Sequence, residues 1–539
     1  MEKQGIKEIT AHLKKNSSPY VSNVWISDLK DGNYQNPVLY ADYSDPDVCR
    51  VEEDYYMTAS SFNCIPGLPI LHSKDLVNWT LIGSALPRLI PEANFSVPQH
   101  GNGVWAPSIR HHNDEFYIYY GDPDYGIYMT KTKNPAGEWE PLLLVKAGKG
   151  LIDACPFWDE DGQAYLVHAY AGSRAGIKSV LAITRLTPDG KQTLGESKIV
   201  YDGHLSDETI EGPKFYKRNG YYYLFAPAGG VATGWQTALR SKNIWGPYER
   251  KVVLSQGNTS INGPHQGAWI DTKSGEDWFI HFQDASAYGR VTHLQPMTWK
   301  NDWPVIGQDN DGDGCGEPVN VYQKPNVGKE YPVATPIESD EFAANRLGLQ
   351  WQWHANPADW WYFTDQKKSC LRLFSVPVPA NYKNVWDLPN LLLQKFPARS
   401  FTATTKLTFY PNSRIKGERA GLLVMGLDYA LLSLESTEKG IILSQNECLS
   451  AENGNKETVH ESIVRTEETF YLRVTIDSTA QCVFSYSVDG TNYKPLGKSF
   501  HAKEGKWIGA KVGLFCSRPS KNNDGGYVDV DWFRIDKQS

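Results

Sequence analysis

The stretch TIEGPKFYKRNGYYYLF at residues 209–225 contains the pattern that decides the fold. A polar turn at Asn219-Gly220 joins two short runs, and the aromatic content of the second run favours a β-strand. A polar turn followed by an aromatic run occurs five times: VEEDYYMTAS (51–60), HHNDEFYIYY (111–120), DEDGQAYLVHA (159–169), KRNGYYYLFA (217–226) and TKSGEDWFIHF (272–282). The aromatic anchors of these repeats, 61, 48, 58 and 56 residues apart, are Tyr56, Tyr117, Tyr165, Tyr223 and Phe279.

Each repeat has room for about four short strands, which is the content of one propeller blade. Five repeats therefore predict a five-bladed β-propeller over residues 36–325, preceded by a polar lead-in at 1–35. The Pro-containing segment 326–341 is predicted to be a linker. Short apolar runs separated by Gly, Asn and Asp turns predict a β-sandwich over 342–539. The fold class is therefore predicted to be all-β.

The composition agrees with a large β-rich globular chain and excludes several functions. The 539 residues include 18 Trp, 30 Tyr and 19 Phe, and exposed aromatic rings suit stacking on sugars. A formal net charge of -8 argues against a nucleic-acid binder, and no run of about 18 apolar residues predicts a membrane span. The eight cysteines contain no Cys-x-x-Cys spacing. The first residues lack the apolar core of a secretory signal, which leaves the compartment open: cytoplasm, or periplasm or exterior with a signal removed.

A set of polar and aromatic residues lies at one repeated position, 11 to 14 residues before each anchor. Equivalent positions at the start of the innermost strands of a propeller point toward the central axis, so these side chains are expected to meet in one funnel. The five residues are Asp45, Trp105, Asp153, Glu211 and His265. Three carboxyl groups that converge on a cavity raise at least one pKa, as a general acid near neutral pH requires. Two carboxyls with an aromatic wall suit glycoside hydrolysis.

The motifs at these positions resemble those of glycoside hydrolase family 43. They are Ser44-Asp45-Pro46-Asp47, His72-Ser73-Lys74-Asp75-Leu76-Val77-Asn78-Trp79, Trp105-Ala106-Pro107, Ile152-Asp153, Ile210-Glu211-Gly212-Pro213 and Gly289-Arg290-Val291-Thr292. The C-terminal half is similar to the concanavalin-like sandwich of that family's β-xylosidase-type members. The resemblance covers nearly the whole chain and is specific for the family rather than for a substrate.

The resemblance implies a role for each carboxyl group. Asp45 matches the general base that activates water, and Glu211 matches the general acid that protonates the leaving oxygen. Asp153 matches a third carboxylate that orients the acid and tunes its pKa. The family inverts configuration, which places the base and acid about 6.5–9.5 Å apart with room for a water molecule. Ala154 departs from the Pro that many relatives have after the Asp.

Four further residues are expected to contact substrate or metal. Arg290 matches a substrate-binding arginine close to the acid, and Trp105 and Phe62 are candidate stacking walls. His265 matches a central histidine that in many relatives faces a water-coordinated calcium, so the resemblance implies a structural Ca²⁺ near the propeller axis, contacted directly or through water. No cofactor is expected to be required. The acidic stretch 309–314 has Asn320 at the twelfth position of a calcium loop instead of Glu, which favours a plain acidic turn.

These features predict an inverting exo-glycosidase that removes terminal pentoses from xylan or arabinoxylan oligosaccharides. The resemblance implies β-1,4-xylosidase activity, α-L-arabinofuranosidase activity or both, with xylosidase ranked slightly ahead because of the sandwich. One alternative is a non-catalytic carbohydrate-binding propeller protein. A second is a retaining fructosidase, whose Asn-Asp-Pro-Asn, Arg-Asp-Pro and Glu-Cys motifs this chain lacks. An oligosaccharide is the expected partner.

Overall fold

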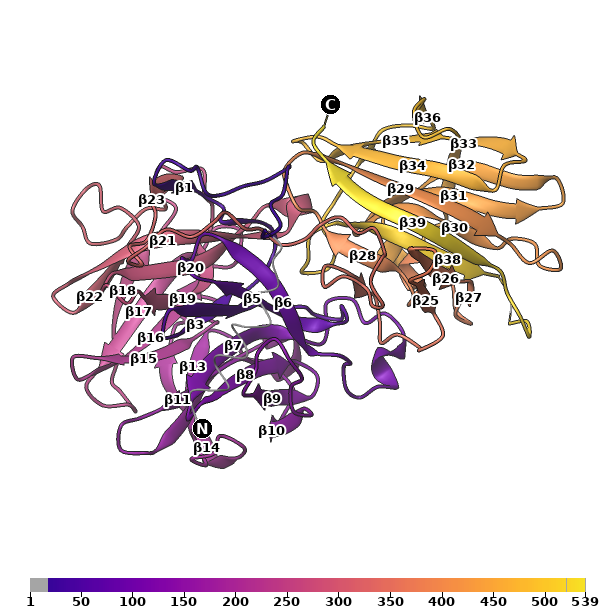
Figure 1. Ribbon diagram of the computed structural model, residues 1–539. Helices are drawn as coiled ribbons and strands as arrows, with labels where there is room; N and C mark the ends of the chain where they lie inside the picture. The colour runs from indigo at the N-terminus through magenta and orange to yellow at the C-terminus, as the bar shows by residue number, and fades with distance from the viewer. Residues whose placement is uncertain (1–17, 520, 539) are drawn as a thin grey trace.

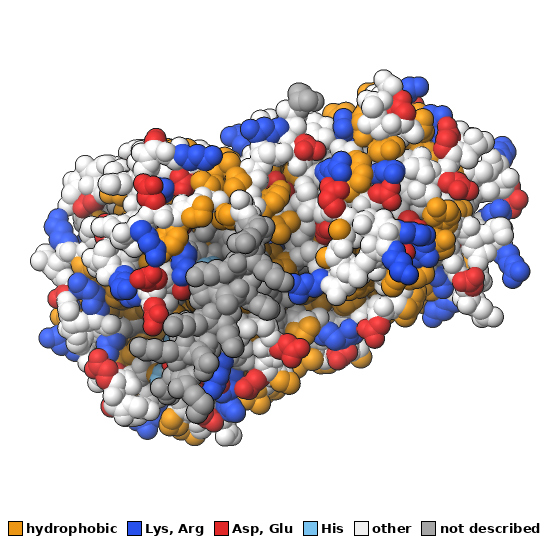
Figure 2. Space-filling model, viewed as in Figure 1, with side chains coloured by type: hydrophobic (Ala, Val, Ile, Leu, Met, Phe, Trp, Pro, Cys, Tyr) orange, Lys and Arg blue, Asp and Glu red, His pale blue; other side chains and the backbone are white. Residues whose placement is uncertain are grey.

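The computed structural model describes residues 18–519 and 521–538, so residues 1–17 of the predicted lead-in lie outside the described residues. Figure 1 shows two bodies side by side, a propeller built from the first part of the chain and a sandwich built from the last part. The fold is all-β, with a five-bladed propeller followed by a β-sandwich, as predicted. Basic and acidic side chains are intermixed over the face seen in Figure 2.

Five antiparallel sheets form the propeller, and four of them are built from consecutive strands. Blade one contains β3 (Asp47–Val51), β4 (Asp54–Thr58), β5 (Gly67–Ser73) and β6 (Trp79–Leu86). Blade two contains β7 (Trp105–His112), β8 (Glu115–Asp122), β9 (Gly126–Thr132) and β10 (Leu143–Ala147). Blade three contains β11 (Leu151–Trp158), β12 (Ala164–Tyr170), β13 (Val180–Leu186) and β14 (Thr193–Asp202). Blade four contains β15 (Lys214–Arg218), β16 (Tyr221–Ala228), β17 (Trp235–Ser241) and β18 (Glu249–Leu254).

The fifth blade closes the ring with a strand from the other end of the propeller. It contains β19 (His265–Asp271), β20 (Asp277–Asp284), β21 (Arg290–Lys300) and β22 (Trp303–Ile306), and β2 (Leu39–Asp42) also pairs with β21. A short ladder between β1 (Asn33–Gln35) and β23 (Val321–Gln323) joins the two ends again. These pairings fix the first and last segments of the propeller to each other.

The aromatic anchors lie in the second strand of every blade, as the five repeats require: β4, β8, β12, β16 and β20. Neighbouring residues of a strand point to opposite faces, so each of these strands packs against the blades on both sides. Tyr55 packs in the cluster between blades one and five, whereas Tyr56 packs in the cluster between blades one and two. Consecutive bulky residues are therefore used at both blade interfaces, which explains the aromatic content of the repeats.

Two antiparallel sheets form the C-terminal sandwich. The first has the order β24 (Gln352–Trp353), β28 (Leu392–Lys395), β38 (Lys511–Arg518), β30 (Arg419–Met425), β31 (Tyr429–Thr437), β32 (Gly440–Cys448) and β33 (Thr458–Arg465), with β27 (Val376–Pro377) parallel to β38. The second has the order β25 (Tyr362–Asp365), β26 (Cys370–Phe374), β39 (Tyr527–Asp536), β29 (Phe401–Tyr410), β34 (Thr469–Ile476), β35 (Gln481–Ser487) and β36 (Lys494–Pro495), with β37 (Phe500–His501) on β35.

Helical structure among the described residues is short: α2 (Gly172–Ala175), η1 (Asn94–Ser96), η2 (Ser286–Tyr288), η3 (Val385–Asp387) and η4 (Ala451–Asn453). None of these helices is long and apolar enough to cross a membrane. The eight cysteines are all free.

The two bodies share one hydrophobic core. Ala287, Tyr288 and Val291 of blade five pack in the cluster that fills the space between the sandwich sheets. The backbone of Ile65 in blade one also exchanges two hydrogen bonds with Trp353 of β24. Because buried apolar contacts and backbone hydrogen bonds both cross this interface, the sandwich is held in a fixed position beside the mouth of the propeller.

Candidate active site

The five predicted ring residues all lie where the innermost strand of a blade begins. Each one precedes, by four or five positions, the residue that pairs with the aromatic anchor of its blade. The larger sequence offset of His265 arises because the anchor Phe279 follows its partner Trp269 by ten residues, against seven or eight in the other blades, so the position of His265 in the blade matches the others. A common position in the blades therefore directs all five side chains toward the propeller axis.

The backbone at these positions adopts conformations that L-residues rarely use. Asp45 has φ 54° and Asp153 has φ 59°, and Ala106 and Gln266 follow the ring residues of blades two and five with φ of 30° and 42°. The pairing register also shifts where β7, β11 and β19 begin. Such bulges re-aim side chains, and strain of this kind costs about 1–3 kcal/mol per residue and concentrates at functional sites.

The ring residues open into a pocket of about 90 Å³. Its lining residues are Asp45, Phe62, Trp105, Ala106, Ile152, Asp153, Glu211, Val231, Gln266, Arg290 and Trp507. Six of the seven predicted site residues thus line one pocket, and the seventh, His265, lies directly behind it against Glu211. The structure brings the predicted set together.

Asp45 is held by donors on one side of its carboxylate. The hydroxyl groups of Ser44 and Ser60 each donate to Oδ2 at 2.6 Å, and Nη1 of Arg290 lies 3.5 Å from the same oxygen. Ser60 Oγ also accepts from the backbone N–H of Ala106 at 2.8 Å, which ties blade one to blade two. Oδ1 of Asp45 accepts no hydrogen bond from any described residue, so this oxygen is available to a water molecule in the pocket.

Asp153 and Glu211 lie on the other side of the pocket. Oδ2 of Asp153 accepts a 2.7 Å hydrogen bond from the backbone N–H of Gly212, the residue that follows Glu211. Burial raises the pKa of Asp153 well above its usual range, and the negative charges of Glu211 and Asp45 raise it further. Asp153 therefore retains its proton at a higher pH than an isolated carboxyl group would.

The remaining predicted residues form the walls and support of the pocket. Arg290 is almost fully buried, donates to Ser44 Oγ at 2.9 Å and lies over the ring of Trp507 at 5.7 Å. The rings of Phe62 and Trp105 face each other edge-on at 6.4 Å. Nε2 of His265 lies 3.1 Å from Oε1 of Glu211. The histidine therefore fixes the carboxyl group of Glu211 and does not contact the open pocket.

Sequence analysis missed Trp507, which comes from the sandwich and not from the propeller. Its ring lies 6.1 Å from that of Trp105 and completes the pocket wall between Trp105 and Arg290. Trp507 lies in the loop before β38 with φ 65°, and 47% of its surface is exposed. No repeat or motif marks this position; an isolated Trp between Gly505 and Gly509 was the only signal.

Two buried cations below the pocket were also missed. Lys214 is fully buried and donates to the Pro107 carbonyl and to Ser108 Oγ, both at 2.8 Å. Arg110 pairs with the fully buried Asp47 at 2.6 Å. The charge of Lys214 opposes the rise in the pKa of Asp153. Lys214 therefore offsets part of the carboxylate charge of the funnel from inside the blades, whereas Arg110 neutralises Asp47.

The calcium expected near the propeller axis, contacted by His265 directly or through water, stays a prediction. Calcium takes six to eight oxygen ligands. In the part of the chain that the structure describes, the only group of three or more candidate side chains close enough to share an ion is Asp309, Asp311 and Asp313, in the turn after β22. Nδ1 of His265 is buried without a hydrogen-bond partner among the described residues.

A propeller whose axis opens into a small pocket with three carboxyl groups, an arginine and aromatic walls defines a glycoside hydrolase. The model of glycosyl hydrolases family 43 matches residues 34–304, and that of the β-xylosidase C-terminal concanavalin A-like domain matches residues 339–536. The chain belongs to glycosyl hydrolases family 43, as its motifs predicted.

Comparison with individual proteins gives full-length matches. The chain is 41% identical to a putative β-xylosidase of Xylanibacter ruminicola, over 91% of this chain and 87% of that protein. It is 28% identical to a non-reducing end α-L-arabinofuranosidase of Bacteroides ovatus, over 95% of this chain and 96% of that protein. A GH43 protein of Bacillus licheniformis superposes with a TM-score of 0.79 at 25% identity, over 94% of this chain and 100% of that one.

Proposed function

We propose that this chain is an inverting exo-glycosidase that removes terminal pentoses from xylan or arabinoxylan oligosaccharides. The observation that carries the proposal is the small pocket itself, in which three carboxyl groups face aromatic walls and Trp507 of the sandwich closes one side. A closed wall at this point limits the pocket to the end of a sugar chain. The names of the relatives support a pentose as the sugar that is removed: one is a putative β-xylosidase and another an α-L-arabinofuranosidase.

Each carboxyl group receives the role that its surroundings favour. Asp45 acts as the general base, because two hydroxyl donors hold Oδ2 and leave Oδ1 for the attacking water. Glu211 acts as the general acid that protonates the leaving oxygen, and His265 positions it. Asp153 is a positioning residue that keeps a proton on that side of the pocket. Bond cleavage and attack by water on the opposite face invert the configuration of the sugar.

Among the two pentosides, β-1,4-xylosidase activity ranks first. The relative with the higher identity is called a putative β-xylosidase, and the C-terminal domain matches the β-xylosidase C-terminal model over its whole length in this chain. Because a relative at 28% identity is named an α-L-arabinofuranosidase, the same experiment also tests α-L-arabinofuranosidase activity.

The test is hydrolysis of p-nitrophenyl β-D-xylopyranoside and p-nitrophenyl α-L-arabinofuranoside, together with xylo-oligosaccharides. Asp45→Asn keeps an oxygen acceptor for Ser44 and Ser60, and we expect it to lose about 10²–10⁴-fold in kcat on every substrate. Glu211→Gln should lose as much on oligosaccharides but far less on aryl glycosides, because nitrophenol leaves without protonation. Asp309→Asn, which removes a carboxylate outside the pocket, is the matched control and should retain full activity.

The stereochemistry is read from the first-formed anomer by ¹H NMR. Inversion of a β-xyloside gives α-xylose first, whereas a retaining fructosidase-type mechanism would give the β-anomer. Binding of oligosaccharides without turnover, by protein whose circular dichroism shows a folded β-structure, would refute the enzyme and leave a carbohydrate-binding protein. Turnover that survives Asp45→Asn would refute the assignment of the base.

A further inference from the structure

A second cavity lies between the propeller and the sandwich, and the catalytic mechanism does not use it. Its volume is about 310 Å³, and it shares no lining residue with the catalytic pocket. Strands β2, β5 and β6 of the propeller, the connector at 334–338 and 346–353, and β28 of the sandwich supply its walls. A volume of this size is at the lower end of the range for small-molecule sites.

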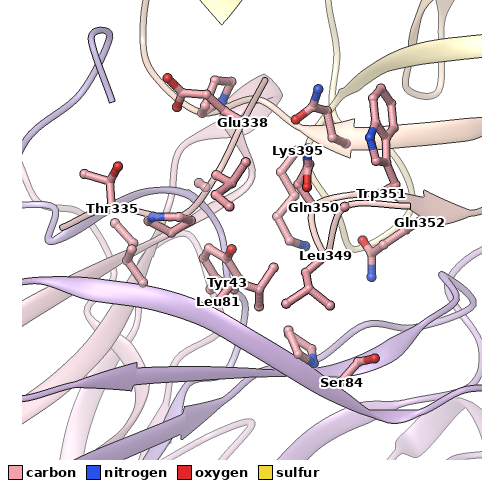
Figure 3. Close-up of a pocket in the computed structure, with 18 of the residues that line it drawn as sticks. Tyr43, Leu81, Ser84, Thr335, Glu338, Leu349, Gln350, Trp351, Gln352 and Lys395 are labelled. Atoms are coloured by element: carbon pink, nitrogen blue, oxygen red, sulfur yellow. The ribbon is translucent and has the colours of Figure 1, made fainter. Parts of the chain in front are cut away.

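One lysine amine faces the middle of this cavity. Figure 3 shows the side chain of Lys395 pointing inward from β28, between Tyr43 of the propeller and Leu349 of the connector. Nζ of Lys395 lies 5.2 Å from the centre of the Tyr43 ring. Among the described residues no carboxylate lies within 4 Å of this amine, and no hydrogen bond from it is found. A partly buried charged amine without a counter-ion is costly unless a ligand pairs with it.

The neighbours of Lys395 do not supply the missing counter-ion. Asp42 is the nearest acidic influence, but its two oxygens already accept from the backbone N–H groups of Arg290 at 2.9 Å and Gly509 at 3.0 Å. Lys511 adds a second positive charge nearby. Burial first, and then Lys511, lower the pKa of Lys395 to about 8, against the opposing effect of Asp42. The local field therefore favours an incoming negative charge.

The rest of the cavity wall is mostly apolar. Leu81, Leu349 and Trp351 lie around the space that Lys395 enters. Leu349 and Ile337, both lining residues, keep 40% and 50% of their surface exposed, so the cavity has an apolar rim that solvent reaches. An inorganic anion would leave these walls uncovered. The polar part of the lining, which includes Glu338, Arg346 and several hydroxyl groups besides the amine and the amides, is the smaller part, so the ligand that fills the cavity is itself largely apolar.

Two amide groups of the lining also have unused hydrogen-bonding capacity. Nε2 of Gln394 and Oε1 of Gln350 are buried without a partner among the described residues. Gln394 precedes Lys395 on β28, and its side chain is almost fully buried. A buried amide without a partner costs about 1–3 kcal/mol, as does the loss of any buried donor. The polar groups at this end of the cavity therefore lack a ligand rather than a protein partner.

We propose that this interdomain cavity binds a small amphipathic carboxylate, whose carboxylate pairs with Nζ of Lys395 and whose ring or chain lies against Tyr43, Leu81 and Leu349. The site is separate from the catalytic pocket, yet the two are linked through Asp42. That residue holds the backbone of Arg290, whose side chain contacts Asp45, and of Gly509, two residues after Trp507.

The experiment is isothermal titration calorimetry of the full chain with trans-cinnamate as the probe. Cinnamamide is the matched neutral analogue, and acetate carries the charge without the ring. We expect cinnamate to bind at least tenfold more tightly than either. Lys395→Met should reduce cinnamate affinity at least tenfold and abolish the difference between cinnamate and cinnamamide. Lys498→Met, which removes an exposed lysine outside the cavity, should leave cinnamate affinity unchanged.

A second variant tests the position of the site independently of Lys395. Leu349→Glu places a negative charge at the exposed rim, where the fold tolerates it, and should weaken cinnamate binding at least tenfold. Both variants should hydrolyse glycosides like the unmodified protein, which shows that they fold. Equal affinity for cinnamate and cinnamamide, binding that survives Lys395→Met, displacement of cinnamate by excess xylose, or no binding by the unmodified chain would each overturn the proposal.

Discussion

Asp153→Asn should move the alkaline limb of the pH–rate profile to lower pH. The asparagine keeps an oxygen to accept the 2.7 Å hydrogen bond from Gly212 but has neither charge nor titratable proton. In the unmodified protein, burial and the charge of Glu211 hold the pKa of Asp153 well above its usual range. Asp153 therefore holds its proton to a higher pH than an isolated carboxyl group, and the variant lacks that proton.

The size of the shift follows from the repulsion between two carboxylates in this pocket. Two like charges about 6 Å apart at an effective dielectric constant of about 20 repel each other by about 2.8 kcal/mol, which corresponds to about two pH units. Water that enters the open pocket screens part of this energy, so we expect a shift of roughly one to two pH units.

The assay is kcat/KM for an oligosaccharide from acidic to alkaline pH, because an aryl glycoside needs little protonation and would conceal the effect. The acidic limb serves as the internal control and should stay in place. An alkaline limb that stays where it was, in a folded variant with reduced activity, would refute the coupling between Asp153 and Glu211. A shift toward higher pH would refute its sign.

Three further outcomes follow from the contacts described. Trp507→Ala should raise KM about tenfold, because the substrate loses one wall of the pocket. Trp360→Ala, at a similarly exposed tryptophan of the sandwich, is the control and should leave KM unchanged in the same assay. Burial raises the pKa of Glu338 from 4.5 to about 7, so ionisation of this carboxyl group lowers the free energy of unfolding progressively between these pH values. Glu338→Gln should therefore stabilise the protein by up to about 3 kcal/mol at pH 8 and by little at pH 4, as measured by urea unfolding. Dialysis against EDTA should change kcat less than about twofold, because Lys214 supplies a positive charge that acts on Asp153. A larger loss that calcium restores would contradict this expectation.

The aromatic repeats made the propeller predictable because each repeat encodes a local structure. The turn at Asn219-Gly220 joins two strands of one blade, and the rings at 221–223 pack in the clusters between this blade and its two neighbours. The closure of blade five was not predictable in the same way. Leu39 and Asp42 pair with β21, about 250 residues away, and nothing in four residues of β2 identifies that partner.

The three carboxylates were predictable because they occupy an equivalent position in blades one, three and four. Side chains at equivalent positions of a propeller point toward the same central axis. The groups that tune them were not. Lys214 and Gly212 act on Asp153 from the next blade through charge and a hydrogen bond, and Ser60 donates to Asp45 from the far side of the first hairpin of blade one. A serine or a lysine in a strand has many ordinary uses, so its residue type alone carries little information about such a contact.

Trp507 shows why the sandwich belongs to the active site rather than to a separate accessory function. The end of its loop that leads into β38 is fixed by the propeller: Gly509 donates its N–H to Asp42, and the neighbouring Ala510 donates to the Ala287 carbonyl of blade five. The same Asp42 holds the backbone of Arg290, the side chain of which lies beside Asp45. One buried carboxylate therefore sets the position of a pocket wall and of a substrate-side cation together. A change at this interface should alter KM and kcat while leaving every catalytic carboxyl group in place.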